Sequence, residues 1–499
     1  MRDPFSQPFC RPEDLGLAIP DSDHAVSVCL PTWKDVVGYE EGEPDVLEAL
    51  ECGYPRFLEH PFVVELFQSA QQEFAKTGEA ALVFPSLAAA WRCADYVKQR
   101  TGASCRLESY GWNRLAAVLV DGASYDTAWQ CWQHGGEIVS SRLAESALTD
   151  APLDKAVVSA GGEALSVLRE RLASFHEKAE PEDVFLFSSG MAAIFAVHRI
   201  VTEQRPDEAT IQIEFPYLDT FKVQNHFGEG GVVDVSVTQS GGLEEIREWF
   251  DSGKKAAAVY SELPSNPLLR TPNLADIAPI LREHGVPLIV DDTVATSVNV
   301  DGFRFADAIT TSLTKAFSGA GDVAGGCVIL NRRSPFYESL KESLPSEESA
   351  APLFERDAVV LETNSRHFEE RVRATGENAA GLVEWLRDRA EIERLWFPST
   401  ECRGFYDAVR RDDGGCGALF SFVLEGGEGA AAKFYDALEL SKGPGLGTDF
   451  SLVCPYTLLA HYRELDWAAE RGARRDLVRC WVGLEEPEDL RERFERALA

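Results

Sequence analysis

The sequence lacks the short patterns that mark metal-binding, secreted and membrane-spanning proteins. None of its eleven cysteines lies in a Cys-x-x-Cys pair and none of its nine histidines lies in a His-Glu-x-x-His pair, so we expect no bound metal. The N-terminal residues MRDPFSQPFCRPEDLG contain no apolar segment of the kind that a signal peptide requires. No apolar run reaches the roughly 18 residues of a membrane-spanning helix. We therefore expect a cytoplasmic protein with reduced thiols.

Basic residues are also scarce. The chain has 48 Lys and Arg residues against 82 Asp and Glu residues, which gives a formal net charge of −34. Such an excess of carboxylates repels nucleic acids and anionic membrane surfaces, so we expect neither as a partner. A well-solvated acidic surface is the simplest explanation, and a salt-adapted host would produce the same composition.

The length of 499 residues exceeds what a single hydrophobic core usually serves. We expect an N-terminal arm over 1–60, a small α/β unit over 61–150, a large cofactor-binding domain over 151–340 and a small C-terminal domain over 341–499. The polar segment 343–352 is expected to form a flexible hinge after the large domain.

Apolar strands alternate with helices in the third part. The strands are expected at 184–189, 210–215, 256–263 and 286–292. Nearly all-apolar strands that alternate with helices predict a mostly parallel sheet that is covered on both faces. In the second part, one of the expected strands is the segment EIVSS at 137–141.

One candidate for chemistry is Lys315, which follows Ser312 and Thr314. A lysine amine bonds to the aldehyde of pyridoxal phosphate (PLP) only when it is deprotonated, and an apolar or cationic environment favours that state. The two hydroxyl groups can hold a phosphate. The same three residues also fit an ordinary surface helix start with Ser and Thr caps.

Two further candidate segments end strands. Asp291, Asp292 and Thr293 follow an apolar strand, at the edge where open α/β sheets bind ligands. An aspartate there can pair with a pyridinium nitrogen, or simply cap a helix. Gly190 and Met191 begin a helix after another strand, where backbone N–H groups can hold a phosphate.

The fourth segment is FPYLDT, which contains Tyr217. A tyrosine can stack on a cofactor ring and donate a proton, although, taken alone, the segment is explained better by a buried core tyrosine. None of the four segments is specific alone. Their order along the chain is Gly190, Tyr217, Asp291 and Lys315.

This order and the wording of the segments resemble the Cys/Met-metabolism family of PLP-dependent enzymes, the cystathionine γ-synthase-like proteins. The matching segments are FSSGMAAI, FPYLDT, ELPSNPLL, VDDTVAT, TSLTKAFSG and LVRCWVGLE. The segments HAVSVCLPTWKDVVGYEEGE and WQHGGEIVSSRLAE look similar to the extended cystathionine γ-synthases of fungi. The resemblance implies an α/β fold of the aspartate-aminotransferase-like type (fold type I). Such a fold has a mostly parallel sheet flanked by helices, a smaller α+β C-terminal domain and, here, an extra N-terminal α/β unit.

The resemblance also implies roles around the cofactor. Lys315 would be the Schiff-base lysine and would shuttle protons between substrate carbons, while Asp291 would pair with the ring nitrogen. Tyr217 would stack on the ring and serve in catalysis. The other cofactor-binding residues would be Gly190, Met191, Ser312 and Thr314 at the phosphate, Glu262 and Asn266 near the ring hydroxyl, and Thr293.

Members of this family also bind the phosphate through a Tyr-x-Arg pair that reaches over from a neighbouring subunit. Tyr54-Pro55-Arg56 has this pattern but lies far from Gly190 in the sequence. Arg142 lies nearer but has no matching tyrosine. Both alternatives stay open, and either one implies a homodimer or a homotetramer.

At the substrate end, Arg479 matches the arginine that binds the substrate α-carboxylate. Gly445 stands where the family usually has a serine that helps orient the substrate, so its missing side chain is expected to enlarge the pocket. The resemblance implies γ-replacement on an O-activated homoserine, with cysteine as the nucleophile and cystathionine as the product. A carbon or nitrogen nucleophile, a γ- or β-lyase reaction, and a non-catalytic paralogue are the alternatives.

Overall fold

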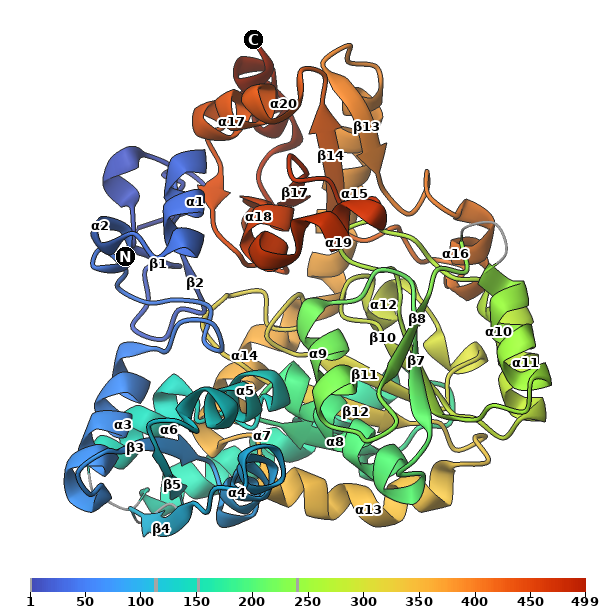
Figure 1. Ribbon diagram of the computed structural model, residues 1–499. Coiled ribbons are helices and arrows are strands. Elements are labelled where there is room, and N and C mark those ends of the chain that lie inside the picture. The colour runs from blue at the N-terminus through green and yellow to red at the C-terminus, as the bar shows by residue number, and fades with distance from the viewer. Residues whose placement is uncertain (1, 112–114, 150–152, 239–241) are drawn as a thin grey trace.

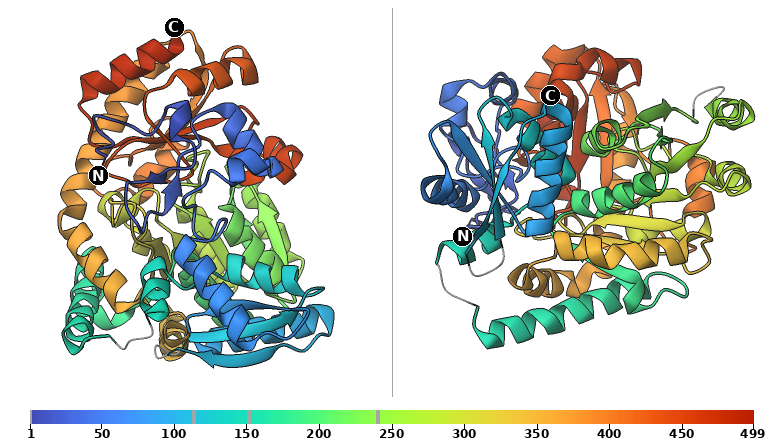
Figure 2. Two further views of the ribbon diagram at one scale, coloured as in Figure 1. Left: turned by 90° about the vertical axis from the view of Figure 1, so that its left-hand side faces the viewer. Right: turned by 60° about the horizontal axis from the view of Figure 1, so that its bottom comes forward.

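The computed structural model describes residues 2–111, 115–149, 153–238 and 242–499 (Figure 1). In this view the C-terminal residues lie at the top and the N-terminal arm lies beside them. The N-terminal α/β unit and the large sheet lie below. The two further views in Figure 2 likewise show the arm against the C-terminal part of the chain.

A seven-stranded sheet forms the centre of the large domain. Its strands are ordered β6 (Val184–Phe187), β12 (Gly326–Leu330), β11 (Ala308–Ser312), β10 (Leu288–Asp291), β9 (Ala256–Glu262), β7 (Ala209–Ile213) and β8 (Val232–Val235). All neighbouring pairs are parallel except those of β12, which is antiparallel to both β6 and β11. The expectation of a mostly parallel sheet is therefore confirmed.

Alternate side chains of the strands enter two different cores. Leu288 and Val290 of β10 pack in one core, and Ile289 between them packs in the other. This alternation follows from the two-residue period of a strand. The helices of the two faces are α8 (Gly190–Gln204) and α13 (Tyr337–Ala350) on the Ile289 side, and α7 (Lys155–Ser174), α10 (Gly242–Asp251) and α11 (Leu274–Glu283) on the other. Because helices cover both faces, the strands read as continuous apolar runs.

The N-terminal α/β unit is built on an antiparallel sheet. Its strands are ordered β3 (Glu79–Phe84), β5 (Leu115–Asp121) and β4 (Arg106–Tyr110), and its helices are α3 (Pro61–Phe74), α4 (Leu87–Thr101), α5 (Tyr125–Gly135) and α6 (Ser141–Leu148). The strand expected at 137–141 is wrong, because this segment forms no ladder. Instead, Ser140 caps α6 by accepting a hydrogen bond from the N–H of Leu143 at 3.1 Å.

The C-terminal domain has a five-stranded sheet. Its strands are ordered β13 (Ile392–Trp396), β14 (Leu419–Leu424), β17 (Val478–Trp481), β16 (Leu452–Pro455) and β15 (Ser441–Lys442). Its helices include α15 (Phe368–Arg387), α16 (Arg403–Val409), α17 (Gly427–Ala437), α18 (Tyr456–His461), α19 (Leu465–Glu470) and α20 (Pro487–Leu498).

The hinge expected at 343–352 is wrong, because α13 runs through this segment to Ala350. Leu344 is fully buried, and the carboxylate of Glu347 accepts a hydrogen bond from Arg92 at 2.7 Å. One face of the polar segment is thus packed against the core and against the N-terminal unit. The helix α14 (Glu355–Asn364) follows directly and packs against α7.

The arm consists of short elements: β1 (Ala18–Ile19), β2 (Ser27–Val28), α1 (Trp33–Glu41) and α2 (Pro44–Leu47). It is joined to the C-terminal sheet by backbone hydrogen bonds of Lys442, whose N–H donates to Phe9 and whose carbonyl accepts from Leu30, both at 3.0 Å. The division of the chain into four parts at the expected boundaries stays a prediction. No helix in the described ranges is long and apolar enough to cross a membrane.

Candidate active site

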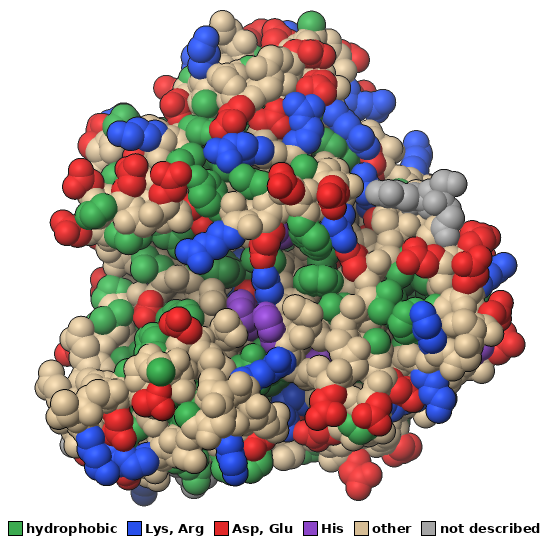
Figure 3. Space-filling model, viewed as in Figure 1, with side chains coloured by type: hydrophobic (Ala, Val, Ile, Leu, Met, Phe, Trp, Pro, Cys, Tyr) green, Lys and Arg blue, Asp and Glu red, His purple; other side chains and the backbone are tan. Residues whose placement is uncertain are grey.

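A cavity of about 170 Å³ lies where the arm, the large sheet and the C-terminal domain meet. Its lining comes from segments that are far apart in the sequence, between Val28 and Arg479. Figure 3 shows the surface hollowed between the arm and C-terminal domain above and the N-terminal unit below. The carboxyl ends of the parallel strands β9 and β10 supply Glu262 and Asp291, at the sheet edge where the sequence placed the site.

Lys315 follows the end of β11, and its side chain lines this cavity. Its Nζ donates a hydrogen bond of 2.7 Å to the hydroxyl of Tyr54. Burial lowers the pKa of Lys315, although Tyr54 partly offsets that effect. Burial alone would raise the pKa of Tyr54, but the positive charges of Lys315 and Arg56 outweigh it and lower that pKa. The site therefore favours a neutral amine with an acid–base partner at hydrogen-bonding distance.

The two aspartates that end β10 have different surroundings. Asp291 lines the cavity, and its carboxylate accepts a hydrogen bond from the N–H of Thr293 at 2.9 Å. Burial raises the pKa of Asp291 to about 6, and no Lys or Arg in the described ranges forms an ion pair with it. Asp292 instead accepts a hydrogen bond from the hydroxyl of Ser297 at 2.6 Å, away from the cavity lining. Asp291 is thus the carboxylate that is free to meet a cationic ring nitrogen.

The N-terminus of α8 lies beside the loop that carries Lys315. Gly190, Met191, Ser312 and Thr314 all line the cavity. A Cβ atom at Gly190 would lie 2.7 Å from the Cβ of Ser312, so only glycine permits this approach. The first N–H groups of a helix have no partner inside the helix and attract anions. With two hydroxyl groups next to them, they form a cradle for a phosphate.

Arg56 completes this side of the cavity. Its guanidinium donates a hydrogen bond of 2.7 Å to the hydroxyl of Tyr217 and forms an ion pair with the fully buried Asp219. Asp219 also contacts the ring of His134 at 2.9 Å. Burial would raise the pKa of Asp219, but the charge of Arg56 outweighs this and lowers it. Asp219 therefore stays charged and fixes Arg56 in place.

The other end of the cavity is built around Arg479 on β17. Its guanidinium donates to the side-chain oxygen of Asn266 at 3.2 Å and lies over the ring of Tyr456, 4.7 Å from the centroid. No carboxylate among the described residues pairs with it, although its side chain is almost completely buried. An unpaired buried guanidinium that borders a cavity is suited to bind a carboxylate through two N–H groups.

Glu262 lies between these two ends and links them. Its carboxylate accepts hydrogen bonds from the N–H of Tyr217 and, at 3.1 Å, from the N–H of Asn266. Burial, reinforced by the nearby Asp291, raises the pKa of Glu262 to about 8.

The structure corrects the interpretation of Gly445. Its carbonyl accepts a hydrogen bond from Arg479 at 3.1 Å. A Cβ atom on this glycine would lie 2.9 Å from Leu452 and 3.5 Å from the hydroxyl of Ser27, and neither residue lines the cavity. The missing side chain therefore does not enlarge the pocket. Gly445 instead helps to hold Arg479 through its backbone.

The structure also separates the two candidate arginines. Tyr54 and Arg56 line the cavity, whereas Arg142 does not and donates to the carbonyl of Asp322 at 2.7 Å and to Asp357 at 3.3 Å. The expectation that the Tyr-x-Arg pair crosses to a neighbouring subunit stays a prediction, and the geometry within one chain offers an alternative. Both side chains reach the cavity of their own chain.

Several lining residues were not found in the sequence. Tyr456 and Glu40 carry no motif, and their place in the site depends on contacts between distant segments. Asp219 lies inside the matching segment FPYLDT, so its position next to Tyr217 was a usable signal.

The comparisons with known proteins agree with this geometry. A family model described as Cys/Met metabolism PLP-dependent enzyme matches residues 161–499. The chain belongs to this family of PLP-dependent enzymes. A second model, described as the N-terminal domain of fungal trans-sulfuration enzymes, matches residues 62–140. The family confirms that the protein is an enzyme and that its cofactor is pyridoxal phosphate.

Individual members of the family align along nearly the whole chain. The chain is 32% identical to cystathionine γ-synthase of Neurospora crassa over 611 residues, which cover 98% of each chain. It is 29% identical to L-2-amino-4-chloropent-4-enoate dechlorinase/desaturase of Streptantibioticus cattleyicolor over 494 residues, which cover 96% of this chain and 97% of the relative.

Among solved structures, cystathionine γ-synthase of Xanthomonas oryzae pv. oryzae in complex with cystathionine is similar with a TM-score of 0.59. It is 25% identical and the match covers 68% of this chain and 86% of that chain. The expected fold type I is therefore confirmed.

The cavity of this PLP-dependent enzyme fits its cofactor. The donor set contains a buried amine for the aldehyde, a carboxylate without a cationic partner for the ring nitrogen, and a glycine-lined helix N-terminus for the phosphate. Those groups belong to Lys315, Asp291 and Gly190. A Cβ at Gly190 would fill part of the cradle, which is why the chain has glycine there.

Proposed function

We propose that this enzyme catalyses γ-replacement on an O-activated homoserine, with cysteine as the nucleophile and cystathionine as the product. In this reaction the C–O bond at Cγ breaks and a C–S bond forms there. The activating acid leaves, and the proton of the thiol is released. One observation supports the proposal most directly. Lys315, whose pKa is lowered, and Arg479, whose guanidinium has no carboxylate partner among the described residues, line the same cavity.

We assign the cofactor-binding roles by chemistry. Lys315 would hold the aldehyde carbon covalently and Asp291 the ring nitrogen, with Thr293 orienting the aspartate. The phosphate would be bound by the N-terminus of α8, Ser312, Thr314, Tyr54 and Arg56, and the ring would lie against Tyr217, near Glu262 and Asn266. When bound, pyridoxal phosphate supplies an electron sink for negative charge at the substrate carbons.

The residues of the chain would move the protons. Arg479 binds the α-carboxylate of the substrate and thereby fixes its orientation. The Nζ of Lys315 then accepts the proton from Cα and passes protons between the substrate carbons. The oxygen of Tyr54, 2.7 Å from that nitrogen, can take the extra proton from the ammonium form and so leave the amine neutral, and can later return it.

A product assay tests the function. Purified holoenzyme is offered acetyl-, succinyl- and phospho-homoserine, each with cysteine, and the products are identified by mass. The proposal expects cystathionine from at least one of the three esters. Release of the activating acid without any C–S product would overturn it.

A second candidate is elimination without an incoming nucleophile. The dechlorinase/desaturase of Streptantibioticus cattleyicolor aligns with 96% of this chain over only 494 residues, whereas the Neurospora enzyme needs 611 aligned residues for 98%. The alignment with the bacterial relative therefore contains fewer gaps than the alignment with the Neurospora enzyme. An unsaturated or oxo-acid product from a γ-substituted amino acid, formed equally with and without cysteine, would favour this candidate.

A further inference from the structure

Among the residues that the structure describes, three carboxylates line the cavity, and one of these has no polar partner there. Glu262 and Asp291 accept the backbone hydrogen bonds described above. Glu40 lines the same cavity, but it accepts no hydrogen bond and forms no ion pair with any residue that the structure describes. Among the described residues, the charge of Arg463 lowers the pKa of Glu40 without forming an ion pair, and the charge of Glu40 acts in turn on the adjacent Tyr39.

The position of Glu40 is well defined, because it lies in the last turn of the helix α1. Thr32 caps this helix in a reciprocal capping box, and the N–H of Trp33 donates to Asp436 at 2.7 Å. At the other end, the hydroxyl of Tyr462 donates to the neighbouring Glu41 at 2.6 Å. Both ends of α1 are therefore fixed to the C-terminal domain, and Glu40 is held at the cavity wall.

An unpaired carboxylate in this place costs free energy. Burial raises the pKa of Glu40 to about 7, which Arg463 partly counteracts. Removal of a charged group from water without a compensating partner is unfavourable, so a partner from outside the chain would restore the balance. The same lining contains the apolar side chains of Val28, Leu30 and Leu459, which offer Glu40 no polar contact.

The cavity consequently has charges suited to two amino acids. Arg479 offers a guanidinium to a carboxylate, and Glu40 offers a carboxylate to a cation. We infer that Glu40 binds the ammonium group of the incoming nucleophile and so selects a thiol that carries an amine. This inference rests on the proposed γ-replacement, and it assigns a selecting role to the N-terminal arm.

Three thiols of similar size test the inference. Cysteine has both an ammonium and a carboxylate, cysteamine has only the ammonium, and 3-mercaptopropionate has only the carboxylate. The holoenzyme is given the best homoserine ester and each thiol in turn, and KM and kcat for the thiol are measured. The variants are Glu40→Gln, Glu40→Lys and, as a matched control on the same arm, Glu48→Gln, whose side chain is exposed and lies outside the cavity lining.

We expect the parent and Glu48→Gln to prefer cysteine and cysteamine over 3-mercaptopropionate. Glu40→Gln should raise KM for the two amines about tenfold or more, as the loss of one charge-assisted contact predicts, and leave KM for 3-mercaptopropionate unchanged. Glu40→Lys should reverse the preference in favour of 3-mercaptopropionate.

An equal loss with all three thiols would overturn the inference, because Glu40 would then act on the thiol itself or on the fold. Unchanged KM and kcat values for all three thiols in Glu40→Gln would overturn the inference as well. The proposed function would still stand in that case, because the thiol product would still form. If no thiol adds in the parent enzyme, the proposed function fails and the inference fails with it, which is a different result from selective loss in the variants.

Discussion

The two aspartates at the end of β10 illustrate how adjacent identical residues acquire different tasks. Their side chains point to opposite faces of the sheet, because successive residues of a strand alternate. One carboxylate therefore enters the cavity, and the other is held by Ser297 behind the sheet. The residues alone leave open which member of the pair would meet the cofactor, and the family resemblance names Asp291.

This difference predicts a contrast between Asp291→Asn and Asp292→Asn. The first change removes the charge that would keep the ring nitrogen protonated, so exchange of the substrate α-proton should slow by at least about tenfold, the factor for one pKa unit. The second change should lower the free energy of unfolding and leave exchange nearly normal. Proton exchange followed by NMR and urea unfolding measure the two effects. Equal effects on exchange would contradict the assignment of Asp291.

Glu262 predicts a pH dependence of stability in the cofactor-free protein. Burial raises its pKa to about 8, well above its ordinary value of 4.5. Between these two values the folded state binds the proton more tightly than the unfolded state, so the free energy of unfolding falls as the pH rises. The slope that this residue can contribute is at most about 1.4 kcal/mol per pH unit. Urea unfolding at several pH values should show a steeper fall in the parent than in Glu262→Gln. Identical slopes would show that Glu262 does not titrate in this window.

The motifs predicted those cavity residues that lie directly beside the strands and helices of the large sheet in the sequence. Lys315, Asp291 and Gly190 were found because each lies at the end of a strand, at the start of a helix or in the turn after a strand of an α/β unit, where the fold itself dictates the location. Glu40 and Tyr456 were not found, since each belongs to a segment whose place depends on long-range packing. Gly445 was noticed but misinterpreted, because the sequence does not show which way a side chain there would point.

At the scale of elements, a buried lysine helps to hold the arm against the C-terminal domain. The Nζ of Lys442 on β15 donates to the carbonyls of Pro31 at 2.9 Å and Asp436 at 3.1 Å, and its side chain is completely buried. Burial lowers its pKa, yet the surrounding carbonyl oxygens satisfy its donors. The arm supplies Glu40, Tyr54 and Arg56 to the cavity, so this clamp stabilises the site from a distance.

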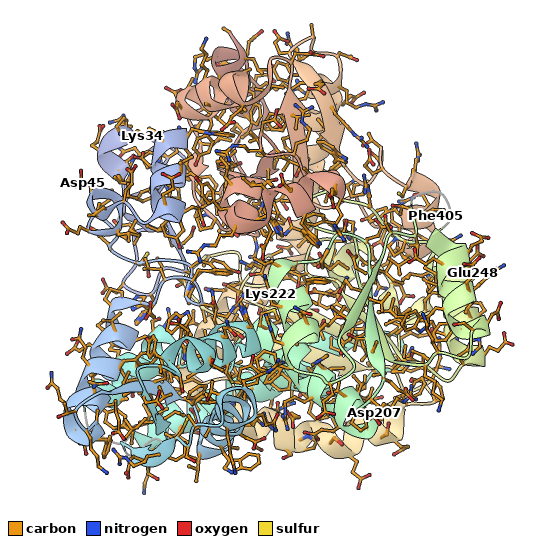
Figure 4. The ribbon with its side chains drawn as sticks, viewed as in Figure 1. Lys34, Asp45, Asp207, Lys222, Glu248 and Phe405 are labelled. Atoms are coloured by element: carbon orange, nitrogen blue, oxygen red, sulfur yellow. The ribbon has the colours of Figure 1, made fainter. Side chains whose placement is uncertain are left out.

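These hydrogen bonds of Lys442 predict that the change Lys442→Met destabilises the arm. The change keeps the apolar stem but leaves buried carbonyl groups without donors, which costs about 1–3 kcal/mol. We expect a lower free energy of unfolding and faster proteolysis within residues 1–60. Lys34→Met is the matched control, because Lys34 is exposed on α1 of the same arm (Figure 4). Equal protease sensitivity of the two variants would show that Lys442 is not needed to hold the arm.

Long periodic elements were predicted more reliably than the segments between them. The apolar strands at 210–215 and 286–292 appear as β7 and β10. The segments 137–141 and 343–352 were assigned wrongly, because their composition was interpreted without their neighbours. The first lies as extended chain between two helices, and the second becomes helical since α13 packs one face on the sheet domain and the N-terminal unit.

At the scale of the whole molecule, segments from the arm to the C-terminal domain of one chain meet around the cavity. The segment 51–60 connects the arm to the N-terminal unit and passes the cavity on the way. It places Tyr54 at Lys315 and Arg56 at Asp219 of the same chain. The formation of a homodimer or homotetramer stays a prediction. The geometry of the single chain predicts that the subunits do not exchange these two side chains.

Complementation between two inactive variants tests this arrangement. One variant is Lys315→Ala, and the other is the double change Tyr54→Ala with Arg56→Ala. Each should be inactive alone, the first through loss of the amine and the second through loss of the phosphate contacts.

If these contacts came from a neighbouring subunit, a mixed dimer would hold one intact site of two. Random pairing makes half of the dimers mixed, so co-expression before purification would restore about a quarter of the activity. Because the structure places all three residues in one chain, we expect no restored activity in co-expressed, differently tagged subunits purified as mixed oligomers. Recovery of about half of the parent activity in the purified mixed dimers, one intact site of two, would show that the segment 51–60 crosses to its neighbour.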